Sequence, residues 1–289
     1  IAPLLLQKLG CNYITLNSQP DGRFPGRLSE PSIENLHIVS NIIKNSPKID
    51  LGMALDGDAD RVIFIDAHGD IIEPVRMLTF LAKKEIERHP PKKGKKIKVM
   101  TPINSSNVIE RTLEPLGCEV IRTQVGDIKV AIEIENQGGL IGGENSGTYI
   151  WPDFGLQPDS LVTIAKLIEL LSYEKKTFTD LIAEIPKFPF VKKEYPLAYD
   201  KVITQEEYRE MGIMVEPWLE EQGYSDIKYT NIDGLRMDFN KGWILIRRSG
   251  TSPILRVEGE SIINEKSSHK NIDATAKILA ESYDYILLK

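Results

Sequence analysis

The 289-residue sequence is poor in cysteine, in long apolar runs and in excess positive charge, and each shortage excludes a class of protein. Its two cysteines, Cys11 and Cys118, lie far apart in apolar stretches, which indicates buried thiols, no disulfide framework and a reducing, cytoplasmic compartment. No apolar run approaches the ~18 residues of a membrane helix, so no membrane partner is expected. The apolar opening Ile1–Leu6 is too short, and lacks the basic flank, for a signal peptide.

The formal net charge of −6 argues against a nucleic-acid partner, because such proteins need a basic face that displaces counterions from phosphates. It does not argue against an anionic substrate, since a few arginines in a cleft can bind phosphate on an acidic protein. What the sequence does contain is 41% hydrophobic and 27% charged residues, which suits buried cores beneath an ordinary surface. The length predicts two or three domains.

Apolar stretches of strand length alternate with helical patterns over the first two thirds of the chain. We expect helices at 3–9, 33–43, 75–88, 105–116, 127–136, 158–172 and 177–185, and strands at 11–17, 51–55, 62–65, 97–100 and 118–122. This alternation predicts α/β domains with mixed, mostly parallel sheets. The basic segment Pro90–Lys96 is expected to be a solvated loop, and Pro186 and Pro189 mark a linker.

The last hundred residues follow another pattern. Candidate strands lie at 227–232, 235–239, 243–247 and 254–259, with helices before them at 201–223 and after them at about 270–285. Asp233-Gly234 and Asn240-Lys241-Gly242 are hairpin signals between these strands. The pattern predicts an α+β domain, an antiparallel sheet with helices on one face.

The first chemically suggestive loop is Asp56-Gly57-Asp58-Ala59-Asp60-Arg61, between two apolar strands. Carboxylates at alternating positions can converge on one hard cation. An EF-hand does not fit, because its sixth position needs glycine and holds Arg61, while its twelfth needs glutamate and holds Ala67. A solvated acidic turn is the competing interpretation.

Two further loops carry polar groups beside glycine. Gly142-Gly143-Glu144-Asn145-Ser146-Gly147-Thr148 offers an acid and a hydroxyl for sugar hydroxyls, although by itself the pattern favours a plain surface turn. Arg247-Arg248-Ser249-Gly250-Thr251-Ser252-Pro253 offers arginine, hydroxyls and exposed backbone amides, which are suitable donors for a phosphate dianion.

Taken together and in this order, the three loops resemble those of the α-D-phosphohexomutases, the family of phosphoglucomutase, phosphomannomutase and phosphoglucosamine mutase. Intervening stretches also match, and the resemblance covers the whole chain: Pro20-Asp21-Gly22-Arg23-Phe24-Pro25, Glu30-Pro31 with Glu34-Asn35-Leu36, and Thr123-Gln124-Val125-Gly126-Asp127. The resemblance implies part of a second domain at 1–74, a third at 75–189 and a fourth at 190–289. No segment resembles the family's phosphoserine loop, so the chain is expected to lack the nucleophile domain.

The resemblance implies an isomerase that transfers phosphate between two oxygens of a hexose phosphate through a phosphoserine and a hexose bisphosphate. Asp56, Asp58 and Asp60 would hold Mg²⁺, and Arg61 would lie beside the reacting phosphate. Substrate would be bound by the following residues of the two later loops: Glu144, Ser146 and Thr148 on the sugar, and Arg247, Ser249, Gly250, Thr251 and Arg256 on the non-reacting phosphate. The missing N-terminal segment or a second copy of the chain would be a partner.

The sequence departs from the family pattern at several positions. Many relatives end the sugar loop in a histidine that moves protons, whereas this chain has Thr148. Asp127 stands where some relatives have histidine, and it also suits a helix N-cap. Gln157-Pro158-Asp159 replaces an Arg-Asp-Gly, and Ser252 replaces a glutamate. These changes keep open a second hypothesis, a non-catalytic paralogue that binds sugar phosphates, and a third, a scaffold protein. No residue identifies the sugar.

Overall fold

The computed structural model describes residues 1–197 and 202–282, which form two compact units. One unit comprises Ile1–Pro102, Val108–Arg122 and Gly126–Pro186, and the other comprises Ile103–Asn107, Thr123–Val125 and the residues from Lys187 onward. None of the helices in the described ranges is long and apolar enough to cross a membrane. The finer division at 74/75 and 189/190 stays a prediction.

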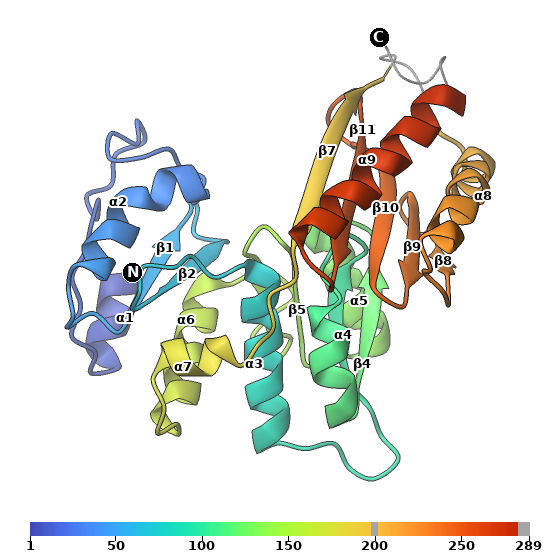
Figure 1. Cartoon of the computed structure of the whole chain (residues 1–289). Helices are drawn as coiled ribbons and strands as arrows, with labels where there is room; N and C mark the ends of the chain where they lie inside the picture. The colour runs from blue at the N-terminus through green and yellow to red at the C-terminus, as the bar shows by residue number, and fades with distance from the viewer. Residues whose placement is uncertain (198–201, 283–289) are drawn as a thin grey trace. The chain divides into compact units, whose positions relative to one another are not determined.

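The first unit begins with α1 (Ala2–Lys8) and α2 (Ile33–Lys44), drawn in blue in Figure 1 near the antiparallel strands β1 (Leu51–Leu55) and β2 (Val62–Asp66). Helix α2 begins after Ser32 as its N-cap, close to the predicted start. The apolar side of the helix packs on the two strands and forms a small core, whose buried members are Leu36, Ile43, Ala54, Ile63 and Ile65. This core places the loop between β1 and β2 at the end of the sheet.

The predicted strand at 11–17 is wrong. The segment is irregular, and Tyr13, Ile14 and Leu16 are exposed. A strand requires a partner for its backbone groups, and in the described residues β1 pairs only with β2. Alternating apolar residues therefore do not by themselves make a strand.

The rest of the first unit builds helices around a second sheet. Its helices are α3 (Pro74–Arg88), α4 (Val108–Leu113), the short 3₁₀ helix η1 (Glu114–Leu116), α5 (Asp127–Gln137), α6 (Ser160–Ser172) and α7 (Phe178–Ala183). Its strands are β3 (Ile97–Pro102), β4 (Cys118–Thr123), β5 (Ile141–Gly143) and β6 (Tyr149–Ile150), in the order β4-β3-β5-β6. Strands β3 and β5 are parallel and β5 and β6 antiparallel, as expected of a mixed sheet.

Local signals explain several element boundaries here. The side chain of Asp159 accepts a hydrogen bond from Val162 N at 2.9 Å and caps α6. Asp127 is not the predicted N-cap of α5, because Gly126 occupies that position and Asp127 is the first helical residue.

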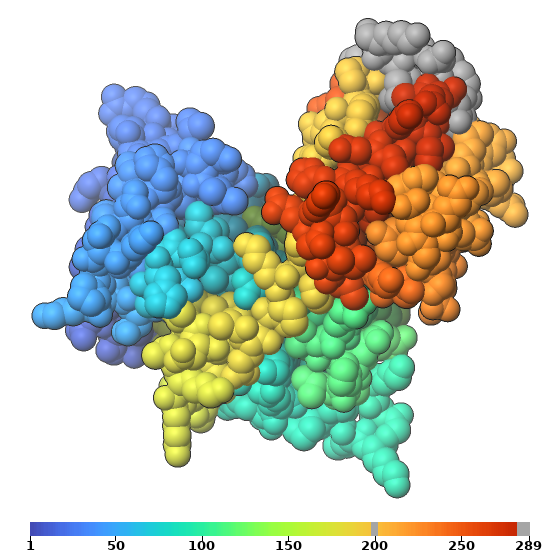
Figure 2. Space-filling view, viewed as in Figure 1, coloured from blue at the N-terminus to red at the C-terminus, as the bar shows by residue number. Residues whose placement is uncertain are grey.

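The predicted helix at 105–116 is shorter and ends as the 3₁₀ turn with Pro115. Residues 90–96 form an exposed loop that projects from the surface (Figures 1 and 2), in agreement with the solvated loop that was expected.

The second unit is an antiparallel sheet of five strands with helices on one face, as predicted. Its strands are β7 (Phe190–Pro196), β8 (Lys228–Thr230), β9 (Leu235–Phe239), β10 (Gly242–Arg248) and β11 (Ile254–Ser261), in the order β7-β11-β10-β9-β8. Strand β7 is not among the predicted strands, and it follows the linker marked by Pro186 and Pro189. The helices are α8 (Gln205–Glu221), which begins with a capping box at Thr204 and Glu207, and α9 (Glu265–Ser282). Residues 201 and 283–285 of the predicted helices lie outside the described residues.

The two faces of this sheet differ in chemistry. One face carries an apolar core with Met211 and Val215 of α8 and Leu279 of α9. On the other face, the register places Arg247 opposite Arg256 and Arg236 opposite Leu245. The loops that follow β3 and β4 pack on this second face, where Ile103, Trp243 and Leu245 form a small buried cluster with Val125 against it. These loops are Ile103–Asn107 and Thr123–Val125, which belong to the second unit although they lie in the middle of the sequence.

Arg236 holds one of these loops. It is almost completely buried, donates to the carbonyl of Ser105 at 2.9 Å and to that of Ile103, and forms an ion pair with Asp238 at 2.9 Å. Its guanidinium carbon lies 4.1 Å from the centre of the Trp243 ring. The second unit therefore has a charged sheet face whose members are held in place by specific partners.

Candidate functional site

The predicted metal loop brings its three aspartates together. Oxygens of Asp56, Asp58 and Asp60 all lie within 4.8 Å of one another. The loop folds back on itself because Arg61 N donates to a side-chain oxygen of Asp56 at 3.1 Å, and Asp56 N donates to the carbonyl of Arg61 at 3.2 Å. Ala59 takes a left-handed conformation, φ 64°, which turns the neighbouring carboxylates to one side.

This arrangement fits a hard divalent cation. Burial, and next the hydrogen-bonded carboxyl of Asp56, raise the pKa of Asp60 to about 6, as expected where negative charges are crowded without a cation. Asp60 Oδ1 is buried and has no hydrogen-bond partner among the described residues. Carboxylate oxygens converging in this way are the ligands that Mg²⁺ prefers.

Arg61 provides the positive charge beside the acidic cluster. Its Nε lies 3.6 Å from Asp60 and 3.8 Å from Asp56, and its Nη1 forms an ion pair with Glu30 at 2.6 Å. Sequence reasoning did not find the role of Glu30, although Glu30-Pro31 was one of the stretches that matched the family. Arg27, from the same segment, donates to the carbonyl of Leu55. Arg27 and Glu30 therefore contact the metal loop and the strand before it.

The predicted sugar loop lies beside the metal loop. It joins β5 to β6, and Thr148 and Arg61 form an antiparallel bridge, while Val62 N donates to Gly147 O at 2.9 Å. Gly147 is necessary at this close approach, because its φ is +93° and a Cβ would lie 3.0 Å from Val62 O. Two loops more than eighty residues apart in sequence thus lie side by side.

The polar groups of the sugar loop have specific partners. Glu144 accepts a hydrogen bond from Gly126 N at 2.7 Å, and burial raises the pKa of its carboxyl. Ser146 Oγ lies 3.4 Å from Thr148 Oγ1, and Thr148 is buried. A buried threonine hydroxyl held by a neighbouring hydroxyl cannot serve as a base near neutral pH. Sequence reasoning matched the stretch around Gly126 but did not find its contact with Glu144.

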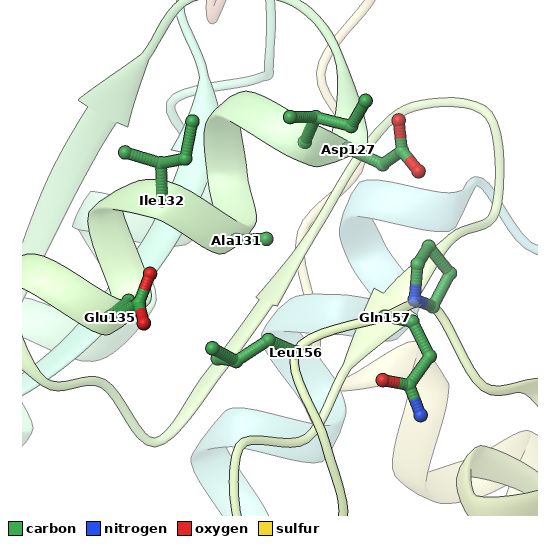
Figure 3. Close-up of a pocket in the computed structure, with 8 residues that line it drawn as sticks. Asp127, Ala131, Ile132, Glu135, Leu156 and Gln157 are labelled. Carbon is green, nitrogen blue, oxygen red and sulfur yellow. The ribbon is translucent and has the colours of Figure 1, made fainter.

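A pocket of about 250 Å³ lies between α5 and the loop before α6 (Figure 3). Its lining is mostly hydrocarbon and consists of Asp127, Ile128, Ala131, Ile132, Glu135, Leu156, Gln157 and Pro158. None of the predicted metal, sugar or phosphate residues lines it. The pocket is therefore not the candidate site, and Asp127 contributes its side chain to the pocket wall.

The predicted phosphate loop joins β10 to β11 in the second unit. Arg247 and Ser249 are buried, whereas Gly250 and Thr251 are exposed. Thr251 N donates to Ser249 Oγ at 3.4 Å, which draws the loop into a tight turn. Two hydroxyl groups and an arginine are thereby brought to one end of the sheet.

The two predicted arginines of this unit already have acidic partners. Arg247 Nη1 lies 3.4 Å from Asp233, and its buried Nε has no hydrogen-bond partner among the described residues. Arg256 forms an ion pair with Glu194 at 3.1 Å. Burial raises the pKa of Glu258, which faces Arg247 on the same side of the sheet. The guanidinium of Arg247 thus has one nitrogen paired with a carboxylate and one buried nitrogen that is left for an anion.

Comparison with known proteins assigns the segments that contain these loops to domains of one family. Profiles described as Phosphoglucomutase/phosphomannomutase match residues 1–69 as alpha/beta/alpha domain II, residues 74–188 as alpha/beta/alpha domain III, and residues 202–273 as the C-terminal domain. A probable phosphoglucosamine mutase of Methanopyrus kandleri is 36% identical over 268 residues, 92% of this chain and 56% of that protein. A phosphoglucomutase/phosphomannomutase of Thermococcus kodakarensis is 35% identical over 280 residues, 97% of this chain and 58% of that protein.

Solved structures show the same fold. A phosphoglucomutase/phosphomannomutase family protein of Burkholderia thailandensis superposes with a TM-score of 0.82 at 24% identity, covering 99% of this chain and 58% of that one. An Aspergillus fumigatus N-acetylphosphoglucosamine mutase, in complex with GlcNAc-6P and magnesium, has a TM-score of 0.62 at 15% identity, covering 83% of this chain and 56% of that one. The chain spans less than two thirds of the length of these proteins.

Proposed function

The chain belongs to the α-D-phosphohexomutase family, and from this premise we propose that the whole protein moves a phosphate between C1 and C6 of a hexose phosphate. The reaction proceeds through a phosphoserine and a hexose bisphosphate, in the cytoplasm. By this proposal the nucleophilic serine lies in sequence outside the 289 residues, so these residues bind ligand but do not turn it over by themselves.

The observation that carries the proposal is the junction of the metal and sugar loops at the Arg61–Thr148 bridge. It places a carboxylate cluster suited to Mg²⁺ beside Glu144 and Ser146, which suit sugar hydroxyls. When bound, Mg²⁺ offsets negative charge on the phosphoryl group in transfer. Asp56, Asp58 and Asp60 would hold it, and Arg61 would add a second positive charge.

The roles of the second unit follow from its donors. Arg247, Ser249, Gly250 and Thr251 would bind the phosphate that does not react, with Arg256 nearby. Arginine suits this task because its planar guanidinium offers two parallel donors to a phosphate. The bound sugar phosphate is thereby oriented, and its other end is left for reaction.

The experiment is calorimetry of the 289-residue chain with glucosamine, glucose and mannose phosphates in the presence of Mg²⁺. Arg247→Ala should weaken binding by about 1.5–3 kcal/mol, the range for a hydrogen bond to a charged group. Arg209→Ala, which removes an exposed arginine of α8, should bind like the wild type. Equal affinity in the Arg247 and Arg209 variants would remove the assignment of the phosphate loop.

A second function is favoured by one observation, the burial of Thr148 where many relatives carry a histidine that moves protons. On this hypothesis the protein is a non-catalytic paralogue that binds sugar phosphates. Both functions predict binding, and they differ in turnover. Mutase activity of the natural protein with any of the three sugar phosphates would exclude the paralogue, and binding without turnover would exclude the enzyme.

A further inference from the structure

The turn between β8 and β9 contains Asp233-Gly234, which the sequence marks as a hairpin signal with no assigned function. In the structure its carboxylate lies between two partners that are far apart in sequence. Asp233 Oδ2 accepts a hydrogen bond from Val125 N at 3.0 Å and lies 3.4 Å from Arg247 Nη1. One carboxylate thus holds both the loop after β4 and the arginine of the phosphate loop.

The backbone of the turn is pressed against strand β10 at Arg247 itself. Gly234 has φ +87°, and a Cβ on it would lie 2.4 Å from Ile246 O and 2.9 Å from Arg247 Cβ. An L-residue with a side chain is strained at this φ and has no space here. The close approach holds the backbone next to Asp233 against the strand that carries the guanidinium.

A second hydrogen bond links the turn to the loop after β4. Gln124 Nε2 donates to Ile232 O at 2.9 Å, next to the bond from Val125 to Asp233. The turn is therefore fixed on two sides, by the strand that carries Arg247 and by residues 124–125.

The guanidinium has an acidic partner at one nitrogen and a buried nitrogen without a partner at another. Nη1 faces Asp233, whereas the buried Nε finds no acceptor among the described residues. A buried donor without a partner is costly, so it marks a place where an acceptor from a ligand would be favoured. An arginine that is already oriented loses less side-chain freedom when it binds such an acceptor.

We propose that Asp233 is a positioning residue for phosphate binding, which orients Arg247 toward the phosphate loop and anchors it to residues 124–125. This inference rests on the proposed function, because it concerns the same phosphate site. Asp233 does not itself touch the phosphate, since two carboxylate oxygens would repel it. It acts through Arg247.

The test is a double-mutant cycle on the 289-residue chain, with inorganic phosphate and glucose 6-phosphate as ligands in calorimetry. Asp233→Ala should raise the Kd for either ligand about fivefold to tenfold, the scale for immobilising one long side chain. On the Arg247→Ala background the same change should have no effect, because the residue through which Asp233 acts is gone. Asp273→Ala, which removes an aspartate paired with Lys193 elsewhere in the unit, should leave the Kd unchanged.

The outcomes separate the inference from the function on which it rests. A Kd in Asp233→Ala within twofold of the wild type, while Arg247→Ala binds more weakly, would overturn the role of Asp233 alone. An effect of Asp233→Ala that is equal on both backgrounds would show a merely structural role and would also overturn it. No phosphate binding by the wild type, or unchanged binding by Arg247→Ala, would overturn the phosphate site and this inference with it.

A second variant covers the case in which the alanine variant does not fold. Asp233→Asn keeps the size of the side chain and one acceptor oxygen but removes the charge. In the protein that retains Arg247, the change should raise the Kd about twofold to fourfold, which is part of the cost of immobilising the arginine side chain. In the Arg247→Ala variant it should have no effect on the Kd. No effect on the first background, or the same effect on both, would contradict the proposal.

Discussion

The metal loop and the phosphate loop each contain an arginine that is paired with an acidic side chain, but the two pairs are buried to different extents. In the metal loop the side chain of Arg61 is 36% exposed and its partner Glu30 is 54% exposed. In the phosphate loop the side chain of Arg247 is 8% exposed and its partner Asp233 is 26% exposed. Because water screens exposed charges far more than buried ones, the second pair should determine geometry more strongly than the first.

The difference follows from the position of each loop in its sheet. The metal loop joins the two strands of a small antiparallel pair, and its Gly57 and Asp58 are exposed. Arg247 lies on β10, which has a neighbouring strand on each side and the Asp233 turn against it. The Arg61–Glu30 pair is therefore partly open to water, whereas Arg247, on a strand inside a sheet, is shielded from it.

The largest expected effect is at the turn that holds Arg247. Gly234→Ala should lower the free energy of unfolding by about 3 kcal/mol or more, since the strain of a left-handed backbone is joined by overlap with Ile246 O. Gly223→Ala is the matched control, with φ +76° and no atom within 4 Å of the added Cβ. It should cost only about 1 kcal/mol, the strain alone. Equal losses in urea unfolding would show that the turn is not packed against β10.

A smaller effect is expected from removing one carboxylate of the metal loop. Asp58→Asn should weaken Mg²⁺ binding, measured by calorimetry, about tenfold or more, because affinity depends on the number of charged ligands. Stability without the cation should not fall, since repulsion among the three carboxylates is relieved. Asp50→Asn, at an exposed aspartate before β1, is the control and should bind Mg²⁺ like the wild type. Unchanged Mg²⁺ affinity in the Asp58 variant would mean that the loop is only a solvated acidic turn.

The smallest effect is expected at the exposed counter-ion. Glu30→Gln removes the most exposed of the acidic partners of Arg61 and should change the free energy of unfolding by less than about 1 kcal/mol, the usual size for an exposed ion pair. Thermal unfolding at low and high salt measures it, and the small difference should vanish at high salt. A larger, salt-independent loss would mean that Glu30 fixes Arg61 as firmly as Asp233 is proposed to fix Arg247, and the contrast between the loops would fail.

Several features of the fold follow from local sequence signals. The helical spacing from Ile33 to Ile43 predicts α2, and the hairpin signals at Asp233-Gly234 and Asn240–Gly242 predict the antiparallel sheet of the second unit. The alternation of strands and helices predicts the mixed sheet around β3. Such signals are readable because they depend on neighbours within a few residues, through period, capping and turn chemistry.

Other features depend on residues far away in the chain. The apolar segment 11–17 has the pattern of a strand but no partner strand. The charged segment of β7 pairs with β11, although its own sequence does not indicate a strand. The short strands β5 and β6 are hidden by the glycines of the sugar loop. A strand is defined by hydrogen bonds to another strand, so local composition cannot decide it.

By itself the sequence determined which chemical groups this protein offers: three alternating carboxylates, an acid and a hydroxyl among glycines, and an arginine beside two hydroxyls. Only the tertiary structure decided which of them meet. It joined Arg61 to Thr148, and Val125 to Asp233, across a long stretch of chain, and it brought Gly126 to Glu144 and Asp233 to Arg247 across 18 and 14 residues. The reason is that the type and spacing of side chains are local properties, whereas the hydrogen bonds and ion pairs that orient them form only after distant strands have packed.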